Sequence, residues 1–126
     1  MAEQAAMVRG GCCCGSIRYE LDPTEGLVVN CHCTICRKTS GAPYVTWIVV
    51  AASQFKWIEA EPATLHASSH GTRGFCSRCG TPVSFVTTKR PGQIDVTVGS
   101  LDDPNPYTPS EDVYIEDKLD WIHELK

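Results

Sequence analysis

The stretch CHCTICRK, residues 31–38, places three cysteines within six positions. A thiolate is a strong ligand for zinc, at a metal–sulfur distance of about 2.3 Å, so this spacing predicts metal binding. Structural zinc sites usually have four protein ligands, whereas catalytic sites leave one position for water or substrate. Cys31, Cys33 and Cys36 therefore form either an open site or a structural site whose fourth ligand comes from elsewhere, and the spacing leaves both open.

Composition limits the class of protein. The chain has 126 residues with ordinary hydrophobic and charged fractions, 42% and 21%, as expected for one soluble domain. Its net charge of -4 argues against a nucleic-acid surface, which needs clustered Lys and Arg. No apolar run approaches the roughly 20 residues that span a bilayer, and residues 1–10 lack a signal-peptide pattern. We therefore expect a cytoplasmic protein without membrane or nucleic-acid partners, whose eight cysteines are metal ligands rather than disulfides.

The rest of the sequence predicts an all-β fold. Short β-branched or alternating runs are separated by Gly and Pro, which is typical of many short strands. Strands are expected at residues 16–21, 27–30, 44–52, 55–59, 64–68, 83–87 and 93–98, the last two forming a hairpin. Residues 37–43 are predicted to be a loop or one helical turn. Residues 113–115 favour a strand, and residues 117–122 favour a strand or a helical turn. We expect a flexible tail over residues 1–10 and a single domain over residues 11–126.

A second cysteine set follows the pattern of a zinc knuckle. In Cys76-x-x-Cys79-Gly80 a tight turn directs both sulfurs to one side, and Gly80 can adopt the positive φ that closes it. Two ligands need a partner pair, and Cys12 and Cys14 suit this because residues two apart on an extended strand face the same way. This predicts a closed site of four thiolates.

Cys13 would then point away and remain a spare residue. A competing arrangement recruits Cys13 to the Cys31 group and forms two closed sites from all eight cysteines. The opposite facing of adjacent strand residues disfavours that arrangement.

Four motifs occur in order along the chain: GCCCGSIRY at residues 11–19, CHCTICRKTSGA at residues 31–42, RGFCSRCGT at residues 73–81 and VGSLD at residues 98–102. Together they resemble the glutathione-dependent formaldehyde-activating enzyme family, which includes centromere protein V. The resemblance covers residues 11–102 and extends toward Trp121.

The resemblance implies a β-tent of two packed antiparallel sheets that holds two zinc ions. By position, the structural zinc ligands are Cys12, Cys14, Cys76 and Cys79, and the catalytic zinc ligands are Cys31, Cys33 and Cys36. It also implies a carbon–sulfur lyase acting on a small-molecule thiol adduct, with the joining of glutathione to formaldehyde as the family example. It says nothing of the oligomeric state.

The expected chemistry is reversible addition of a thiol to an aldehyde, with zinc at the Cys31 group as a Lewis acid. Three thiolates around a divalent ion leave a net charge of -1, which nearby cations would offset. Arg37 and Lys38 are the cations adjacent in sequence. They could instead bind the carboxylates of glutathione, Arg37 through a bidentate fork, or be solvated loop charges.

The histidines and the tryptophans give weaker signals. His32 would face away from the metal on an extended segment, and His66 or His70 could transfer a proton. His123 is expected to be exposed. The tryptophans Trp47, Trp57 and Trp121 could line a pocket but are more often core residues.

A second function class stays open from the sequence. The chain could be a zinc-stabilised module that binds a protein partner without catalysis, in which case the Cys31 group should have four protein ligands.

Overall fold

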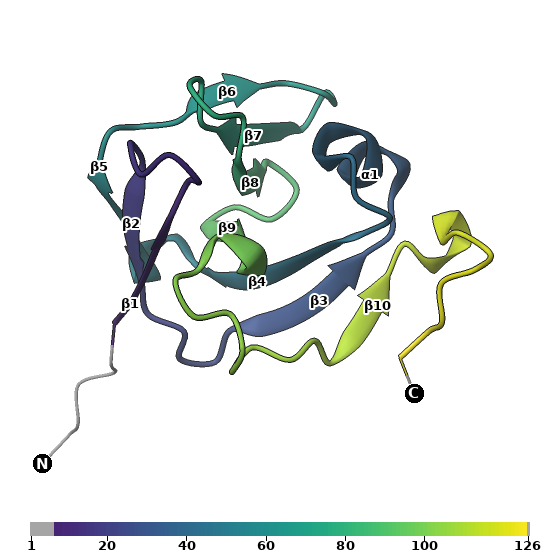
Figure 1. The fold of residues 1–126 in the computed structure, drawn as a ribbon. Helices are drawn as coiled ribbons and strands as arrows, with labels where there is room; N and C mark the ends of the chain where they lie inside the picture. The colour runs from purple at the N-terminus through teal and green to yellow at the C-terminus, as the bar shows by residue number, and fades with distance from the viewer. Residues whose placement is uncertain (1–6, 126) are drawn as a thin grey trace, which may run out of the picture.

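The computed structural model describes residues 7–125, whose strands form two sheets (Figure 1). The strands are β1 (Val8–Gly11), β2 (Arg18–Leu21), β3 (Leu27–Cys31), β4 (Val45–Ala51), β5 (Phe55–Glu59), β6 (Ala63–Leu65), β7 (Gly71–Phe75), β8 (Pro82–Thr87), β9 (Gln93–Thr97) and β10 (Glu111–Val113). The helices are α1 (Thr34–Ser40) and the short 3₁₀ helices η1 (Ala52–Gln54), η2 (Val98–Ser100) and η3 (Ile115–Asp117). None of the helices in residues 7–125 has the length and hydropathy needed to cross a membrane.

The predicted two-sheet, all-β architecture is confirmed. One sheet has the order β1-β2-β5, and the other has the order β10-β3-β4-β9-β8-β7-β6. Figure 1 shows the smaller sheet on the left and the larger one curving from β10 at the lower right to β6 at the top. All pairs are antiparallel except β10, which runs parallel to β3. The sheets are therefore not purely antiparallel as expected, because β10 reaches β3 through a long connection after β9, and such connections permit parallel pairing.

The core lies between the two sheets. Tyr19 and Leu21 of β2 are 0% exposed and pack against Ile48 and Val50 of β4 and Val96 of β9. The apolar run at residues 44–52 was predicted to be a central strand, and β4 does lie between β3 and β9. Burial of these side chains, at about 25 cal/mol per Å² of apolar surface, holds the sheets together.

The VGSLD motif links the smaller sheet to the segment after β9. The Tyr19 hydroxyl lies 2.6 Å from Oγ of Ser100, and the Arg18 guanidinium donates to both carboxylate oxygens of Asp102 at 2.9 and 2.6 Å. Through these contacts the motif helps to join the smaller sheet to the segment after β9.

Several local predictions were wrong. Residues 8–10 belong to β1 rather than to a flexible tail, since they pair with β2; residues 1–6 of that predicted tail lie outside the described residues. The strand expected at residues 64–68 is the shorter β6, and β7 was not predicted. The loop or single turn expected at residues 37–43 is the end of α1, which begins at Thr34 and stops at Gly41, where φ is 74°.

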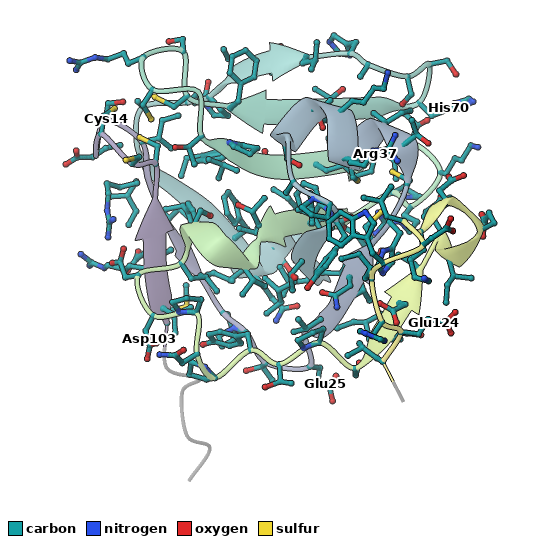
Figure 2. The ribbon with its side chains drawn as sticks, turned by 45° about the vertical axis from the view of Figure 1, so that its right-hand side comes forward. Cys14, Glu25, Arg37, His70, Asp103 and Glu124 are labelled. Carbon is teal, nitrogen blue, oxygen red and sulfur yellow. The ribbon has the colours of Figure 1, made fainter. Side chains whose placement is uncertain are left out.

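The fold separates the two cysteine groups. The first lies at the turn after β1 and the turn after β7, and the second lies at the end of β3 and the start of α1. In Figure 2, Cys14 of the first group and Arg37 of α1 lie on opposite sides of the view.

Candidate metal centres

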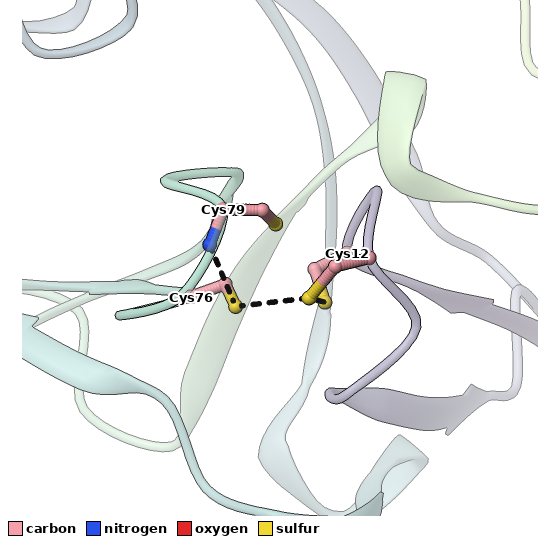
Figure 3. A group of neighbouring side chains, drawn as sticks. Cys12, Cys76 and Cys79 are labelled. Atoms are coloured by element: carbon pink, nitrogen blue, oxygen red, sulfur yellow. Dashed lines mark hydrogen bonds between the residues drawn. The ribbon is translucent and has the colours of Figure 1, made fainter.

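The first candidate centre consists of four sulfurs that converge from two turns. The ligand atoms of Cys12, Cys14, Cys76 and Cys79 all lie within 4.8 Å of one another. The Cys12–Cys14 and Cys14–Cys76 sulfur distances are 3.6 and 3.7 Å. A tetrahedral zinc–thiolate site with bonds of about 2.3 Å has edges of about 3.8 Å, so the spacing fits such an ion. Figure 3 shows the side chains of Cys12, Cys76 and Cys79 directed toward one another.

The two turns have similar hydrogen bonding. Cys12 donates its N–H to the Ile17 carbonyl at 3.1 Å, and Cys76 donates to the Thr81 carbonyl at 3.0 Å. Gly80 has a φ of 82°, as predicted for closing the knuckle. Cys12 and Cys14 lie in a turn, so the extended strand used to pair them was wrong, although the structure does bring their sulfurs together.

Backbone and hydroxyl donors favour the thiolate form of two residues of this group, Cys12 and Cys79. Burial raises the pKa of Cys12, but hydrogen bonds from the Ile17 N–H and the Ser16 hydroxyl outweigh it and bring that pKa down to about 7. The hydroxyl and the N–H of Thr81 lower the pKa of Cys79 to about 5. The anionic form is the one that binds metal.

Cys13 belongs to neither cysteine group in the described residues. Its side chain is exposed, and its N–H donates to Oγ1 of Thr81 at 3.0 Å. The arrangement that recruits Cys13 to the Cys31 group therefore does not occur in this structure.

The second candidate centre contains three sulfurs. Cys31 ends β3, Cys33 caps α1 and Cys36 lies in its first turn, with their sulfurs within 4.8 Å of one another. Cys31 and Cys36 are buried and Cys33 is half-buried. Among residues 7–125, no His, Asp, Glu or further Cys side chain joins this group as a fourth ligand.

The helix cap positions these sulfurs. The Cys36 N–H donates to Sγ of Cys33 at 3.2 Å, and Sγ of Cys36 donates to Sγ of Cys31 at 3.3 Å. The thiols of Cys31 and Cys36 lower the pKa of Cys33, whereas contact with the other two sulfurs and burial raises the pKa of Cys31. Because thiolates are the form that binds metal, binding of a cation to this group would release the protons of its thiols.

Arg73 of β7 is the cation beside this group, and sequence reasoning missed it. Both terminal nitrogens lie 3.6 Å from Sγ of Cys36, and the guanidinium carbon lies 4.6 Å from the centre of the Phe85 ring. Arg73 is only 9% exposed. The signal in the sequence was its place in the RGFCSRCGT motif, which supported the knuckle and the family resemblance but was not connected with the Cys31 group.

Arg37 and Lys38 do not contact the sulfurs in the hydrogen bonds found for the described residues. Arg37 is half-buried and Lys38 is exposed, and both line an open cavity of about 330 Å³ together with Trp121. We expected Arg37 and Lys38 to be the cations beside the thiolates. The hydrogen bonds of the described residues instead place Arg73 beside them.

His32 links the second group to the C-terminal segment. Its Nε2 lies 2.8 Å from Oδ1 of Asp112, and their side chains are 1% and 5% exposed. Burial raises the pKa of Asp112, but hydrogen bonds from His32 and the Leu125 N–H outweigh it and hold this pKa below its usual value. The ring thus faces Asp112 and does not belong to the group of sulfurs. It is deeply buried.

The other predicted histidines and tryptophans have varied surroundings. His66, His70 and His123 are exposed, which confirms the expectation for His123. His66 and His70 contact Thr72 and Thr88, and these contacts do not bring them to the sulfurs. Of the tryptophans, Trp47 is a core residue, Trp57 packs against the core, and Trp121 is 67% exposed.

A cavity of about 290 Å³ lies beside the second group. Eleven residues line it: Thr39, Ser40, Val45, Trp47, Leu65, Arg73, Gly74, Phe75, Gly80, Pro82 and Ser84. Arg73 connects this cavity to Cys36.

The fold and the site define a two-sheet β domain with two cysteine groups that could each hold a metal ion. The sequence profile of the glutathione-dependent formaldehyde-activating enzyme family matches residues 7–117, so the chain belongs to this family. It is 29% identical, over 92% of its own length and 80% of the relative's, to a Halomonas elongata protein named as a candidate glutathione-dependent formaldehyde-activating enzyme. A crystal structure of a Rhodobacter sphaeroides protein shares the fold, with a TM-score of 0.69 and 18% identity over 83% of this chain and 99% of that one.

Proposed function

We propose that this protein is a zinc-dependent carbon–sulfur lyase that interconverts a thiol–aldehyde adduct with its free thiol and aldehyde. Formation of S-(hydroxymethyl)glutathione from glutathione and formaldehyde is the family example. The observation that carries the proposal is the group of Cys31, Cys33 and Cys36, because three sulfurs supply one ligand fewer than a tetrahedral zinc ion takes and leave a fourth position for an exchangeable ligand. The first group, with four sulfurs, takes the structural zinc.

The reaction is balanced without an oxidant or a reductant. In the forward direction the thiol sulfur forms a bond to the carbonyl carbon, and the carbonyl oxygen takes up the proton that the thiol loses. When bound, a zinc ion at the second group supplies a Lewis acid that lowers the pKa of the thiol or polarises the carbonyl. Soft thiolate ligands and sulfurs at tetrahedral spacing suit zinc.

Arg73 compensates for the charge of this site. Three thiolates and a divalent ion carry a net charge of -1, which weakens attraction for an electron-rich ligand. The buried guanidinium, 3.6 Å from Sγ of Cys36, offsets that charge where little water screens it. Arg73 is fixed by its contact with Phe85, so it acts without rearrangement.

Arg37 is proposed as a contact for a carboxylate of glutathione. It shares an open cavity with Lys38 and Trp121, and two cations on one cavity wall favour a ligand with two carboxylates.

The test compares Cys33→Ser with Cys13→Ser, because Cys13 is exposed and lies in neither group. Exchange NMR measures how fast glutathione and formaldehyde equilibrate with their adduct, and metal analysis gives the zinc content. Loss of residues that merely support a metal ligand costs about 10- to 100-fold, so loss of the Cys33 thiolate should cost at least about 100-fold, with Cys13→Ser unchanged. If wild-type protein does not accelerate the exchange for any aldehyde, the protein is better explained as a zinc-stabilised interaction module.

A further inference from the structure

We propose that the cavity of about 290 Å³ beside the second group binds an apolar substituent of an aldehyde larger than formaldehyde, carried on the thiol adduct. This inference rests on the proposed function and specifies the substrate class of the same site.

The cavity shares its walls with the three-cysteine group. Val45 and Trp47 line the cavity and pack in one cluster with Cys31 and Cys36. Ser40, also in the lining, donates its hydroxyl to the Cys36 carbonyl at 2.7 Å. None of the three cysteines lines the cavity itself, so a group held there is separated from the sulfurs by these shared side chains and by Arg73, which contacts Sγ of Cys36.

The cavity is too large for formaldehyde alone. An engineered apolar cavity of about 150 Å³ binds benzene, and one water occupies about 30 Å³ of the liquid. Formaldehyde has two heavy atoms, so its hydroxymethyl group would leave most of the about 290 Å³ unfilled. A phenyl-sized or branched aliphatic substituent would fill it better and remove more apolar surface from water.

The lining favours apolar groups over the peptide part of glutathione. Its largest apolar side chains are Trp47, Phe75 and Leu65, and Arg73 is its single charged residue among those described. Both terminal nitrogens of Arg73 already face Sγ of Cys36. A glutathione carboxylate in this cavity would compete for a cation that is engaged by the cysteine group.

The experiment uses two stable thioethers in place of the adducts. S-methylglutathione represents the formaldehyde adduct, and S-benzylglutathione represents the adduct of an aldehyde with an aromatic substituent. Calorimetry on the zinc-loaded protein should show the benzyl compound binding at least about tenfold more tightly, since burial of one aromatic side group has this effect or more.

Two leucine variants provide the matched comparison. Leu65, 41% exposed, lies on the cavity rim in β6, and Leu27, 45% exposed, lies in β3 outside the cavity lining. Leu65→Trp should reduce the benzyl-to-methyl affinity ratio at least about fivefold by narrowing the cavity. Leu27→Trp should leave the ratio unchanged.

The outcomes separate the two proposals. Equal binding of the two thioethers, or equal effects of the two leucine variants, overturns the cavity proposal. If formaldehyde is turned over in that case, the proposed function stands alone. Selective binding with no turnover of formaldehyde or benzaldehyde contradicts the proposed function and, with it, the assignment of the occupant as an aldehyde substituent.

Discussion

Arg73 is the residue whose replacement best tests the electrostatics of the second group. Arg73→Met keeps much of the apolar stem but removes the cation beside Cys36, so the thiolate charge is no longer offset. We expect exchange of the glutathione–formaldehyde adduct to slow by about 10- to 100-fold, with the zinc content little changed. Arg73→Lys should recover part of the rate, because it retains a charge but loses the two-nitrogen contact. Exchange NMR and metal analysis measure both effects.

Two further variants serve as controls for the effect of Arg73→Met. Arg9→Met removes a cation whose side chain is 64% exposed and should have no effect on exchange. A larger loss for Arg37→Met than for Arg73→Met in the exchange rate at saturating glutathione, where weaker substrate binding no longer matters, would contradict the assignment of Arg73 and favour the cation adjacent in sequence.

At this scale the sequence predicted the cysteine groups but not their surroundings. The spacing of Cys31, Cys33 and Cys36 was enough to predict that they form one group, because they lie within one short segment. Arg73 is separated from Cys36 by 37 positions, and only the packing of β7 brings them together. Adjacency in sequence therefore favoured Arg37, whose side chain lies at a different cavity.

Tyr19 gives a prediction that depends on pH. Burial raises the pKa of Tyr19 to about 12, despite the opposing hydrogen bond with Ser100. The folded state thus favours the neutral phenol. The resulting stability is present below the unfolded pKa of about 10 and is lost as the pH rises through about 12. Two pKa units correspond to about 3 kcal/mol.

Ultraviolet absorbance and chemical denaturation measure this effect. In the wild type, one tyrosine should ionise near pH 12, and Tyr19→Phe should remove that step. The free energy of unfolding of the wild type should fall more steeply above pH 10 than that of Tyr19→Phe. Identical pH dependence of the two proteins would contradict the burial argument.

Strand β10 links the second group to the C-terminal segment through strand pairing and hydrogen bonds. Its residues Asp112 and Val113 lie opposite Asn30 and Cys31 in the parallel pairing with β3. The Asp112 carboxylate accepts hydrogen bonds from Nε2 of His32 at 2.8 Å and the Leu125 N–H at 2.7 Å. One carboxylate thus holds the segment between Cys31 and Cys33 in place.

Asp112→Asn should weaken the hydrogen bonds of this side chain with His32 and Leu125. Hydrogen bonds to a charged group contribute about 1.5–3 kcal/mol, so we expect the free energy of unfolding to fall by about 2 kcal/mol. Zinc should also leave the second group faster when a chromogenic chelator is added. Denaturation and chelator kinetics measure the two effects, with Asp103→Asn, an exposed acidic residue of the loop before β10, as control. Unchanged zinc release would show that Asp112 stabilises β10 alone.

Strands and helices could be predicted where the local pattern of residues was sufficient to determine them. The apolar, β-branched run at residues 44–52 could only be buried on both sides, and it forms β4. The strand favoured at residues 113–115 is β10, which begins two residues earlier, and its parallel pairing with β3 could not be predicted because it forms across a long connection. Helix α1 was missed because its start depends on the Cys33 cap, whose sulfur was considered only as a metal ligand.

At the scale of the whole molecule, the two cysteine groups should differ in how their metal is lost. The first group joins the turn after β1 in the smaller sheet to the turn after β7 in the larger one, so its ion would hold the sheets together. The second group lies within one segment of the larger sheet and offers three sulfurs. Removing an ion from the first group should therefore cost folding free energy, whereas removing one from the second should cost mainly activity.

Stepwise chelation tests this difference. We expect about two zinc ions per chain, since each group could hold one tetrahedral ion. The three-sulfur site should release its ion first, with loss of adduct exchange and no change in circular dichroism. Release of the second ion should coincide with unfolding, because apparent binding free energies of structural zinc are about 10–16 kcal/mol, as large as the stability of a domain. Cys79→Ser should make that unfolding occur at lower chelator concentration, and Cys13→Ser should not, since Cys13 lies outside both groups. Release of both ions in one step, with activity and structure lost together, would contradict the division between a catalytic and a structural site.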